Sequence, residues 1–156
     1  MIKRITNPSE FEKLIDDMYE LFKKQDSTEG HALLTHDPET IKANLSHTSI
    51  LAWDFFVWGN LNNGKFDAMI AFNKVRDAKF NEEIFYEFLW LSKNPKVGYK
   101  LFKTAVDSAR QSECKYIVMA TAVNNPSYPK VKSFYQKMGF LKDTETYISK
   151  IGRAHV

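Results

Sequence analysis

The sequence contains little cysteine and glycine and has no long hydrophobic run. Its single cysteine, Cys114, excludes an internal disulfide and a cysteine-rich zinc site. No histidine is placed to activate this thiol, so we expect a small packed residue. The histidines also lack a metal-ligand spacing such as H-E-x-x-H, and we expect no metal. Without an apolar run of about 18 residues or a secretory leader pattern, we expect a cytoplasmic protein that does not bind a membrane.

The composition is that of a globular domain. Of 156 residues, 44% are hydrophobic, 26% charged and 14% aromatic, which is enough for one well-packed core. The net charge of +3 is small and dispersed, which argues against nucleic acid as a partner. We expect one domain over residues 1–151, followed by a short tail over 152–156.

The segment from Glu82 to Arg110 predicts a strand, a turn and a helix. Ile84–Leu91 is apolar on both faces except for Glu87, which is typical of a central strand. A basic turn, Ser92–Val97, follows, and a helical period of apolar residues begins at Gly98. Free N–H groups at such a helix start favour a bound phosphate, although an ordinary connection with solvated lysines would look the same. The glycine pattern matches neither the dinucleotide-binding nor the NTP-binding fingerprint.

The other expected elements surround this segment. Asn7 and Glu10 form a capping box for a helix that begins at Pro8 and ends near Lys24. Asn63-Gly64 predicts a hairpin with a slightly long loop, and residues 74–83 read as a charged connection. The further expected elements are strands at Ile2–Ile5, Ile50–Trp58, Phe66–Asn73, Tyr116–Val123 and Glu145–Ile151, a short helix capped by Asp37, and a helix at Pro129–Met138. This order predicts an α/β (α+β) fold, a mixed sheet with helices on both faces.

The segment Ser133–Phe140, SFYQKMGF, carries a more specific signal. Five of its residues match the F-Y-x-K-x-G-F pattern of the GNAT superfamily of N-acyltransferases, which the chain resembles most closely over residues 84–142: Phe134, Tyr135, Lys137, Gly139 and Phe140. Gly98 fits the sixth position of that family's phosphate-loop pattern, [RQ]-x-x-G-x-[GA]. Lys93 and Lys96 depart from it at the first and fourth positions. The resemblance implies a mostly antiparallel central sheet.

The resemblance also implies an acetyl-CoA-dependent N-acetyltransferase, with the coenzyme as acyl donor. Backbone groups of Leu89, Trp90 and Leu91 would pair with the pantetheine arm and polarise the acyl carbonyl. The other implied coenzyme contacts are the backbone around Lys96, Val97, Gly98, Tyr99 and Lys100, the side chains of Lys93, Lys96 and Lys100, and Asn125.

Two side chains are candidates for the chemistry. Tyr135 matches the family tyrosine that protonates the leaving thiolate, and a phenol keeps its proton at neutral pH. A core tyrosine is the alternative. Glu87, a carboxylate in an apolar strand, would be a general base whose pKa is raised by desolvation. A structural or solvent-facing carboxylate is the alternative there.

Other functions stay open at this point. The lysine-substituted loop is compatible with a catalytically degenerate module that binds coenzyme A poorly or serves as an interaction domain. Nucleic-acid binding through four lysines (93, 96, 100 and 103) ranks last because no stacking aromatics are interleaved with them. The amine acceptor, a small molecule or a protein, is not encoded in a readable pattern. The resemblance makes residues 25–36 a candidate specificity loop, and a mobile connector is the alternative. Exposed aromatics in Ile50–Phe72 would be compatible with a homodimer.

Overall fold

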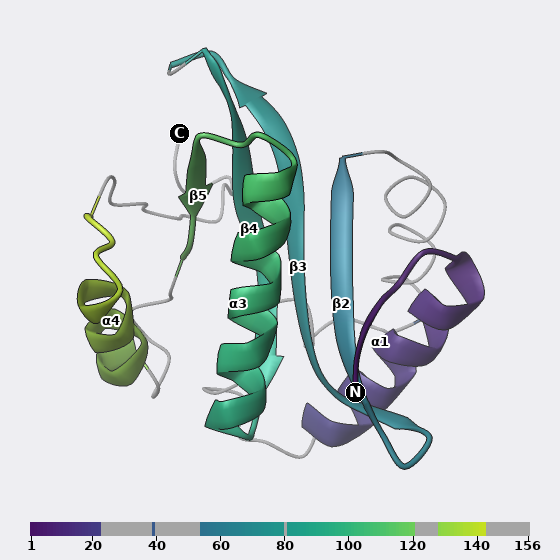
Figure 1. Ribbon diagram of the computed structural model, residues 1–156. Helices are drawn as coiled ribbons and strands as arrows, with labels where there is room; N and C mark the ends of the chain where they lie inside the picture. The colour runs from purple at the N-terminus through teal and green to yellow at the C-terminus, as the bar shows by residue number, and fades with distance from the viewer. Residues whose placement is uncertain (23–38, 40–53, 80, 121–127, 143–156) are drawn as a thin grey trace, which may run out of the picture.

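The computed structural model of the chain describes residues 1–22, 39, 54–79, 81–120 and 128–142 (Figure 1). Its elements are β1 (Ile2–Arg4), α1 (Pro8–Phe22), β2 (Phe55–Asn62), β3 (Lys65–Asp77), β4 (Glu82–Ser92), α3 (Pro95–Gln111), β5 (Tyr116–Val118) and α4 (Tyr128–Lys137). The described strands form one sheet in the order β1-β2-β3-β4-β5. The first three pairings are antiparallel and β4–β5 is parallel. The mixed, mostly antiparallel α+β fold predicted from the sequence is therefore confirmed.

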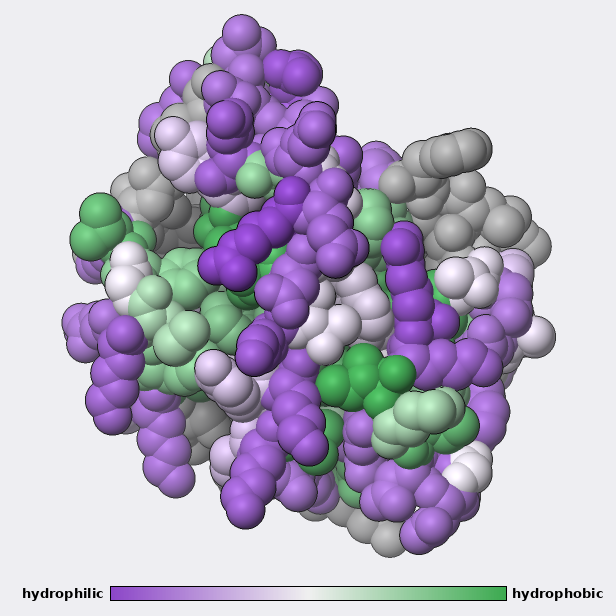
Figure 2. Space-filling model, in the orientation of Figure 1, coloured by the Kyte–Doolittle hydropathy of each residue, from purple (hydrophilic) through white to green (hydrophobic). Residues whose placement is uncertain are grey.

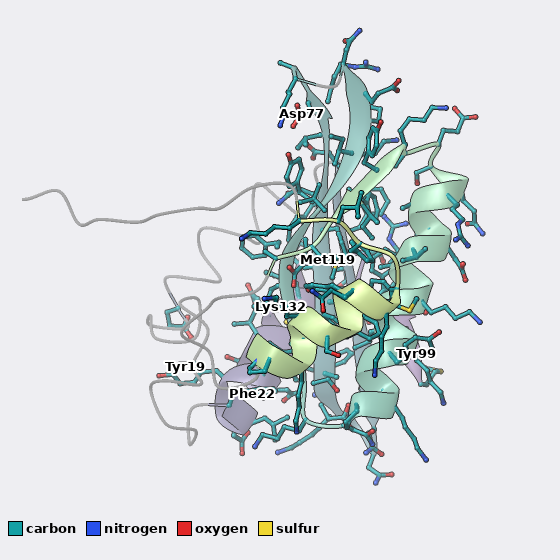
Figure 3. The ribbon with its side chains drawn as sticks, turned by 90° about the vertical axis from the view of Figure 1, so that its left-hand side faces the viewer. Tyr19, Phe22, Asp77, Tyr99, Met119 and Lys132 are labelled. Atoms are coloured by element: carbon teal, nitrogen blue, oxygen red, sulfur yellow. The ribbon has the colours of Figure 1, made fainter. Side chains whose placement is uncertain are left out.

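Helices α1 and α3 cover opposite faces of the sheet. The apolar stripe of α1 packs with one set of strand residues, which includes Met69 and Leu89, and the stripe of α3 packs with another, which includes Phe72 and Phe85. In Figure 3 the sheet is seen nearly edge-on, with Tyr19 of α1 on one side and Tyr99 of α3 on the other. The alternation of side chains along β3 and β4 builds both cores at once.

The start of α1 follows its sequence pattern. The amide N–H of Glu10 donates to Asn7 Oδ1 at 2.9 Å, and Asn7 Nδ2 donates to Glu10 Oε1 at 2.8 Å. The predicted capping box is confirmed, with asparagine in the usual Ser/Thr position.

The β2–β3 hairpin is tighter than its sequence suggested. Only Asn63 and Gly64 separate the two strands, and both have positive φ, 52° and 80°. Two left-handed residues match the twist of a two-residue hairpin turn. The prediction of a slightly long loop was therefore wrong, because β3 begins at Lys65.

Residues 74–83 were predicted as a charged connection, and this was wrong. β3 continues to Asp77, and β4 already begins at Glu82. The charged side chains pair across the strands here: Arg76 meets Glu83 at 3.2 Å, and Tyr86 donates to Asp77 at 2.8 Å. Cross-strand pairs of this kind stabilise a strand beyond the point where the apolar pattern ends.

Two boundaries near the phosphate turn also differ from expectation. Helix α3 begins at Pro95 with Asn94 as its cap, one turn earlier than the predicted start at Gly98. The reason is that Asn-Pro supplies both a capping side chain and a residue preset for the first helical position. Strand β5 ends at Val118, so the predicted continuation through residues 119 and 120 was wrong.

Several smaller expectations are settled as well. Cys114 is partly buried and packs against the α3 core, as predicted. Asp54 is exposed and directly precedes β2. The described aromatics of β2 and β3 are buried, which removes the argument for a homodimer from exposed aromatics: Phe55, Phe56, Trp58, Phe66 and Phe72. The predicted last strand at Glu145–Ile151, and all but Glu39 of the helix capped by Asp37, lie outside the described residues.

Candidate active site

Strands β4 and β5 separate in the middle of the sheet. Their parallel pairing runs from Ile84 with Tyr116 to Tyr86 with Val118. β4 then continues to Ser92, and within the described residues no strand pairs with this half of β4 on the β5 side. Backbone groups of Leu89, Trp90 and Leu91 lie in this half, where an extended ligand could add to the sheet edge. Their role towards a pantetheine arm stays a prediction.

A bulge in β4 sets the direction of the side chains at the split. Phe72 of β3 pairs with Glu87, and its neighbour Ala71 pairs with Leu89, so Phe88 has no partner in the ladder. Without this extra residue, Glu87 and Leu89 would lie on the same face of the sheet. With it, Leu89 joins the α1 core, and Glu87 shares the face of Phe72, which belongs to the α3 core. Nothing in the sequence indicated the bulge.

The two predicted catalytic side chains meet at one residue, Ala120. The N–H of Ala120 donates to Glu87 Oε2 at 2.8 Å. The hydroxyl of Tyr135, from α4, donates to the carbonyl oxygen of Ala120 at 3.0 Å. Glu87 Oε1 has no hydrogen-bond partner among the residues that the structure describes. The sequence identified both side chains but not the backbone that joins them.

The carboxyl group of Glu87 is poised to exchange a proton near neutrality. Desolvation by burial raises its pKa from an ordinary 4.5 to about 7, while the hydrogen bond from Ala120 acts in the opposite direction. Desolvation dominates because a carboxylate loses more hydration than one N–H donor restores. A base with this pKa can accept a proton and release it again at physiological pH.

The hydroxyl of Tyr135 is held in its protonated form. Burial raises its pKa, and the negative charge of Glu87 raises it further. Both effects disfavour the phenolate, so at neutral pH the group is a proton donor. In this structure its proton is directed to Ala120.

Aromatic packing fixes the helix that carries Tyr135. Phe134 packs edge-to-face on Phe102 of α3 at 5.2 Å between ring centroids, and its ring also lies 5.8 Å from Trp90 of β4. Tyr135 itself lies 5.4 Å from Phe140, just beyond the helix. In Figure 3, α4 crosses in front of the sheet close to Met119, which packs against the same core. The F-Y-x-K-x-G-F segment thus anchors α4 beside the β4–β5 split.

The start of α3 satisfies its own backbone groups. Asn94 Oδ1 accepts from the N–H of Lys96 at 2.9 Å and from the N–H of Val97 at 3.5 Å, and Gly98 N donates to Asn94 O at 2.9 Å. Pro95 has no N–H. The first turn therefore offers no free N–H, and a phosphate bound there would have to displace the Asn94 side chain. The first turn of α3 fits a pyrophosphate only once the Asn94 side chain has moved away. The predicted coenzyme contacts of Lys96 to Lys100 stay predictions.

Glycine at position 98 brings α3 close to the sheet. A Cβ there would lie 3.3 Å from Ser92 Cβ, tighter than most contacts between side chains. The carbonyl of Gly98 also accepts from Trp90 Nε1 at 3.2 Å. The family glycine therefore has a packing role in this chain.

The predicted phosphate-binding lysines divide into two groups. Lys93 lies with its Nζ 5.5 Å from the ring centroid of Phe22, on the α1 side. Lys96, Lys100 and Lys103 are exposed on α3, as is Tyr99. Figure 2 shows a hydrophilic band along this face, with an apolar area beside it towards α4. Asn125 and the four histidines lie outside the described residues, so the predicted coenzyme contact of Asn125 remains untested.

Solved structures resemble this fold over nearly its whole length, although no protein-family model and no curated protein match the sequence. One is the aminoglycoside acetyltransferase meta-AAC0020 from an uncultured soil metagenomic sample, in complex with sisomicin; it is 11% identical, with a TM-score of 0.67 over 97% of this chain and 96% of that one. Another is a ribosomal-protein-alanine N-acetyltransferase from Brucella melitensis biovar Abortus 2308, 10% identical, with a TM-score of 0.67 over 97% and 99%.

A third structure contains a coenzyme-derived ligand. It is AAC(6')-Iy in complex with the bisubstrate analog CoA-S-monomethyl-acetylneamine, 12% identical, with a TM-score of 0.66 over 98% of this chain and 97% of that one. At these identities the likeness establishes the fold. The chain shares the fold of these acetyltransferases, and this is the fold that the resemblance of its F-Y-x-K-x-G-F segment to the GNAT superfamily implied. None of the described helices is long and apolar enough to cross a membrane.

Proposed function

We propose that the protein is an N-acetyltransferase that moves an acetyl group from acetyl-CoA to a primary amine of a small molecule or a protein. The observation that carries this proposal is the meeting of Glu87 and Tyr135 at Ala120, beside the β4–β5 split. One group is matched to take a proton near pH 7, and the other is held protonated. Acyl transfer from a thioester to an ammonium group needs such a pair.

The chemistry divides between the two side chains. Glu87 takes a proton from the acceptor ammonium, directly or through a water, at Oε1, the carboxylate oxygen without a hydrogen-bond partner among the described residues. The neutral nitrogen attacks the thioester carbonyl carbon, a C–N bond forms and the C–S bond breaks. Tyr135 turns from Ala120 and gives its proton to the thiolate. The attached nitrogen gives its second proton to solvent, and Tyr135 regains a proton from solvent. The products are the amide, the free thiol and one net proton, which leaves through Glu87.

The test begins with the coenzyme. A thermal melt with acetyl-CoA at about 100 times its Kd should raise Tm by roughly 5–10 °C, with ATP as the control polyphosphate. Release of free thiol from acetyl-CoA in the presence of an amine panel then tests transfer. A shift with thiol release supports the proposal, and thiol release that needs no amine contradicts it.

A catalytically degenerate module is the second candidate, and one observation favours it. Asn94 occupies the backbone N–H groups to which a pyrophosphate would bind, and Lys96 stands where the family has glycine. This reading predicts no shift at millimolar acetyl-CoA and no thiol release with any amine. A coenzyme shift without transfer would point to a coenzyme-binding module.

A further inference from the structure

Ala120 carries a hydrogen bond to each candidate catalytic side chain. It follows β5 in the chain, beyond Val118, the last residue that pairs with β4. Its N–H is held by Glu87 and its carbonyl oxygen by Tyr135, at 2.8 Å and 3.0 Å. Both bonds therefore act on the backbone of one residue, the N–H through the peptide group before its Cα and the carbonyl through the peptide group after it.

The surroundings of Glu87 make this link its main polar contact. From β3 it is paired with Phe72, and the charged residue nearest in that strand, Lys74, donates to Ser112 O at 3.2 Å. The α3 residues of this core are apolar, and from α4 the titratable side chain beside Glu87 is Tyr135. Among the described residues the Ala120 N–H is the one hydrogen-bond donor to the carboxylate.

We propose that Glu87 positions the hydroxyl of Tyr135 through the backbone of Ala120, so that the charge of one side chain sets the orientation of the other. An ionised Glu87 draws the Ala120 N–H towards itself, because hydrogen bonds to ionised groups are shorter and stronger. The Ala120 carbonyl is then fixed as the acceptor for Tyr135. When Glu87 takes a proton, the bond weakens, and Ala120 and the Tyr135 hydroxyl become free to move.

The catalytic meaning of this link rests on the proposed acyl transfer, but the link itself does not. In the transfer, the proton that Glu87 takes from the acceptor would release Tyr135 at the moment when the thiolate needs a proton. The base and the acid would thus act in sequence. Glu87 is a positioning residue in this respect, in addition to its proposed role as base.

The sequence offers a sharp probe of Ala120. Met119-Ala120 is the only Met-Ala pair in the chain, and Ala120-Thr121 is the only Ala-Thr pair. Carbonyl ¹³C-methionine with ¹⁵N-alanine labelling gives one NMR cross-peak for the Ala120 amide. Carbonyl ¹³C-alanine with ¹⁵N-threonine labelling gives one for its carbonyl. Both would be titrated from about pH 5 to pH 9 in the wild type, Glu87→Gln and Tyr135→Phe, without acetyl-CoA.

We expect the amide and the carbonyl of Ala120 to titrate together in the wild type, with a midpoint near pH 7. Glu87→Gln should abolish both titrations. Tyr135→Phe keeps the ring packing, so it should leave the fold intact. It should remove the carbonyl titration and move the amide midpoint to higher pH, because a less firmly held N–H stabilises the carboxylate less. Tyr99→Phe, which removes a hydroxyl from a ring that also contacts Phe134, should change neither midpoint.

Two results would overturn the link: an amide titration with no movement of the carbonyl in the wild type, or an unchanged amide midpoint and carbonyl titration in Tyr135→Phe. The first of these results is measured on the wild type alone, so it can overturn the link even if a variant fails to fold. No acceptor or coenzyme is present, so failure here is distinct from failure of the proposed function. The latter shows as absent thiol release with the Ala120 titration intact.

Discussion

The two halves of the candidate site differ in how their polar groups are satisfied. At the start of α3, the side chain of Asn94 takes up the N–H groups of Lys96 and Val97. At the β4–β5 split, Glu87 engages only one carboxylate oxygen within the described residues, and Tyr135 donates to a single carbonyl. The first region is complete without a ligand, whereas the second keeps a reactive group available. The side chains that would perform the chemistry thus already lie together at Ala120, whereas the N–H groups that would bind phosphate are already bonded to Asn94.

The largest effect is expected at the split. Tyr135→Phe removes the proposed donor to the thiolate, and kcat should fall by about 100-fold or more, because general acid catalysis contributes about 10²–10⁴. KM for acetyl-CoA should stay nearly constant, since the hydroxyl acts late in the reaction. Steady-state thiol release measures both constants.

Tyr86→Phe is the matched control. It also removes one tyrosine hydroxyl with a hydrogen bond, to Asp77 at 2.8 Å, from the residue before Glu87, whose side chain lies on the opposite face of the sheet. Each variant should lose about 0.5–1.5 kcal/mol of stability, the usual net value of a hydrogen bond. Equal kcat losses in the two variants would assign Tyr135 a purely structural role.

The second effect concerns the free energy of unfolding that the protein loses because Glu87 is buried. Its pKa is 4.5 ordinarily and about 7 in the fold. Between these values the unfolded chain has lost a proton that the folded protein keeps, so the free energy of unfolding falls as the pH rises. Glu87→Gln removes this dependence and still offers an oxygen to the Ala120 N–H. The variant should gain on the wild type by at most about 3 kcal/mol between about pH 4 and pH 8.

Urea unfolding at a series of pH values measures this gain. Glu82→Gln, the same change at the start of β4 and away from the split, is the matched control. A constant difference between Glu87→Gln and the wild type across the pH range would mean that Glu87 is not desolvated, and its assignment as a base would be lost.

The sequence singled out the two side chains that meet beside the split, but it misplaced the start of α3, and both outcomes have physical reasons. Glu87 stands out because a carboxylate in an apolar strand needs a reason, and Tyr135 stands out through its motif. The role of Ala120 depends on backbone groups, and every residue carries those. The bulge at Phe88 arises from pairing with β3, which a local pattern does not encode.

The start of α3 could have been predicted. Asn94-Pro95 repeats the Asn7-Pro8 pattern that correctly placed the start of α1. Because Gly98 was taken as the start of the helix, the predicted start was one turn too late. The role of Gly98 is close packing against Ser92. The charged ends of β3 and β4 were missed because their stability comes from cross-strand pairs such as Arg76 with Glu83. Neither strand alone shows that partnership.

The smallest effect tests whether the turn is closed against the coenzyme. Asn94→Gly removes the side chain that occupies the first-turn N–H groups and costs the helix only a few tenths of a kcal/mol, by analogy with other caps. If the coenzyme must displace this cap, its Kd should fall by about 2- to 10-fold, the equivalent of one net hydrogen bond.

Asn7→Gly removes the corresponding cap of α1 and should leave the Kd unchanged. Calorimetric titration with acetyl-CoA measures both variants. A higher Kd in Asn94→Gly would mean instead that the Asn94 amide itself binds the phosphate. The coenzyme would then bind the turn without removing Asn94 from the helix start.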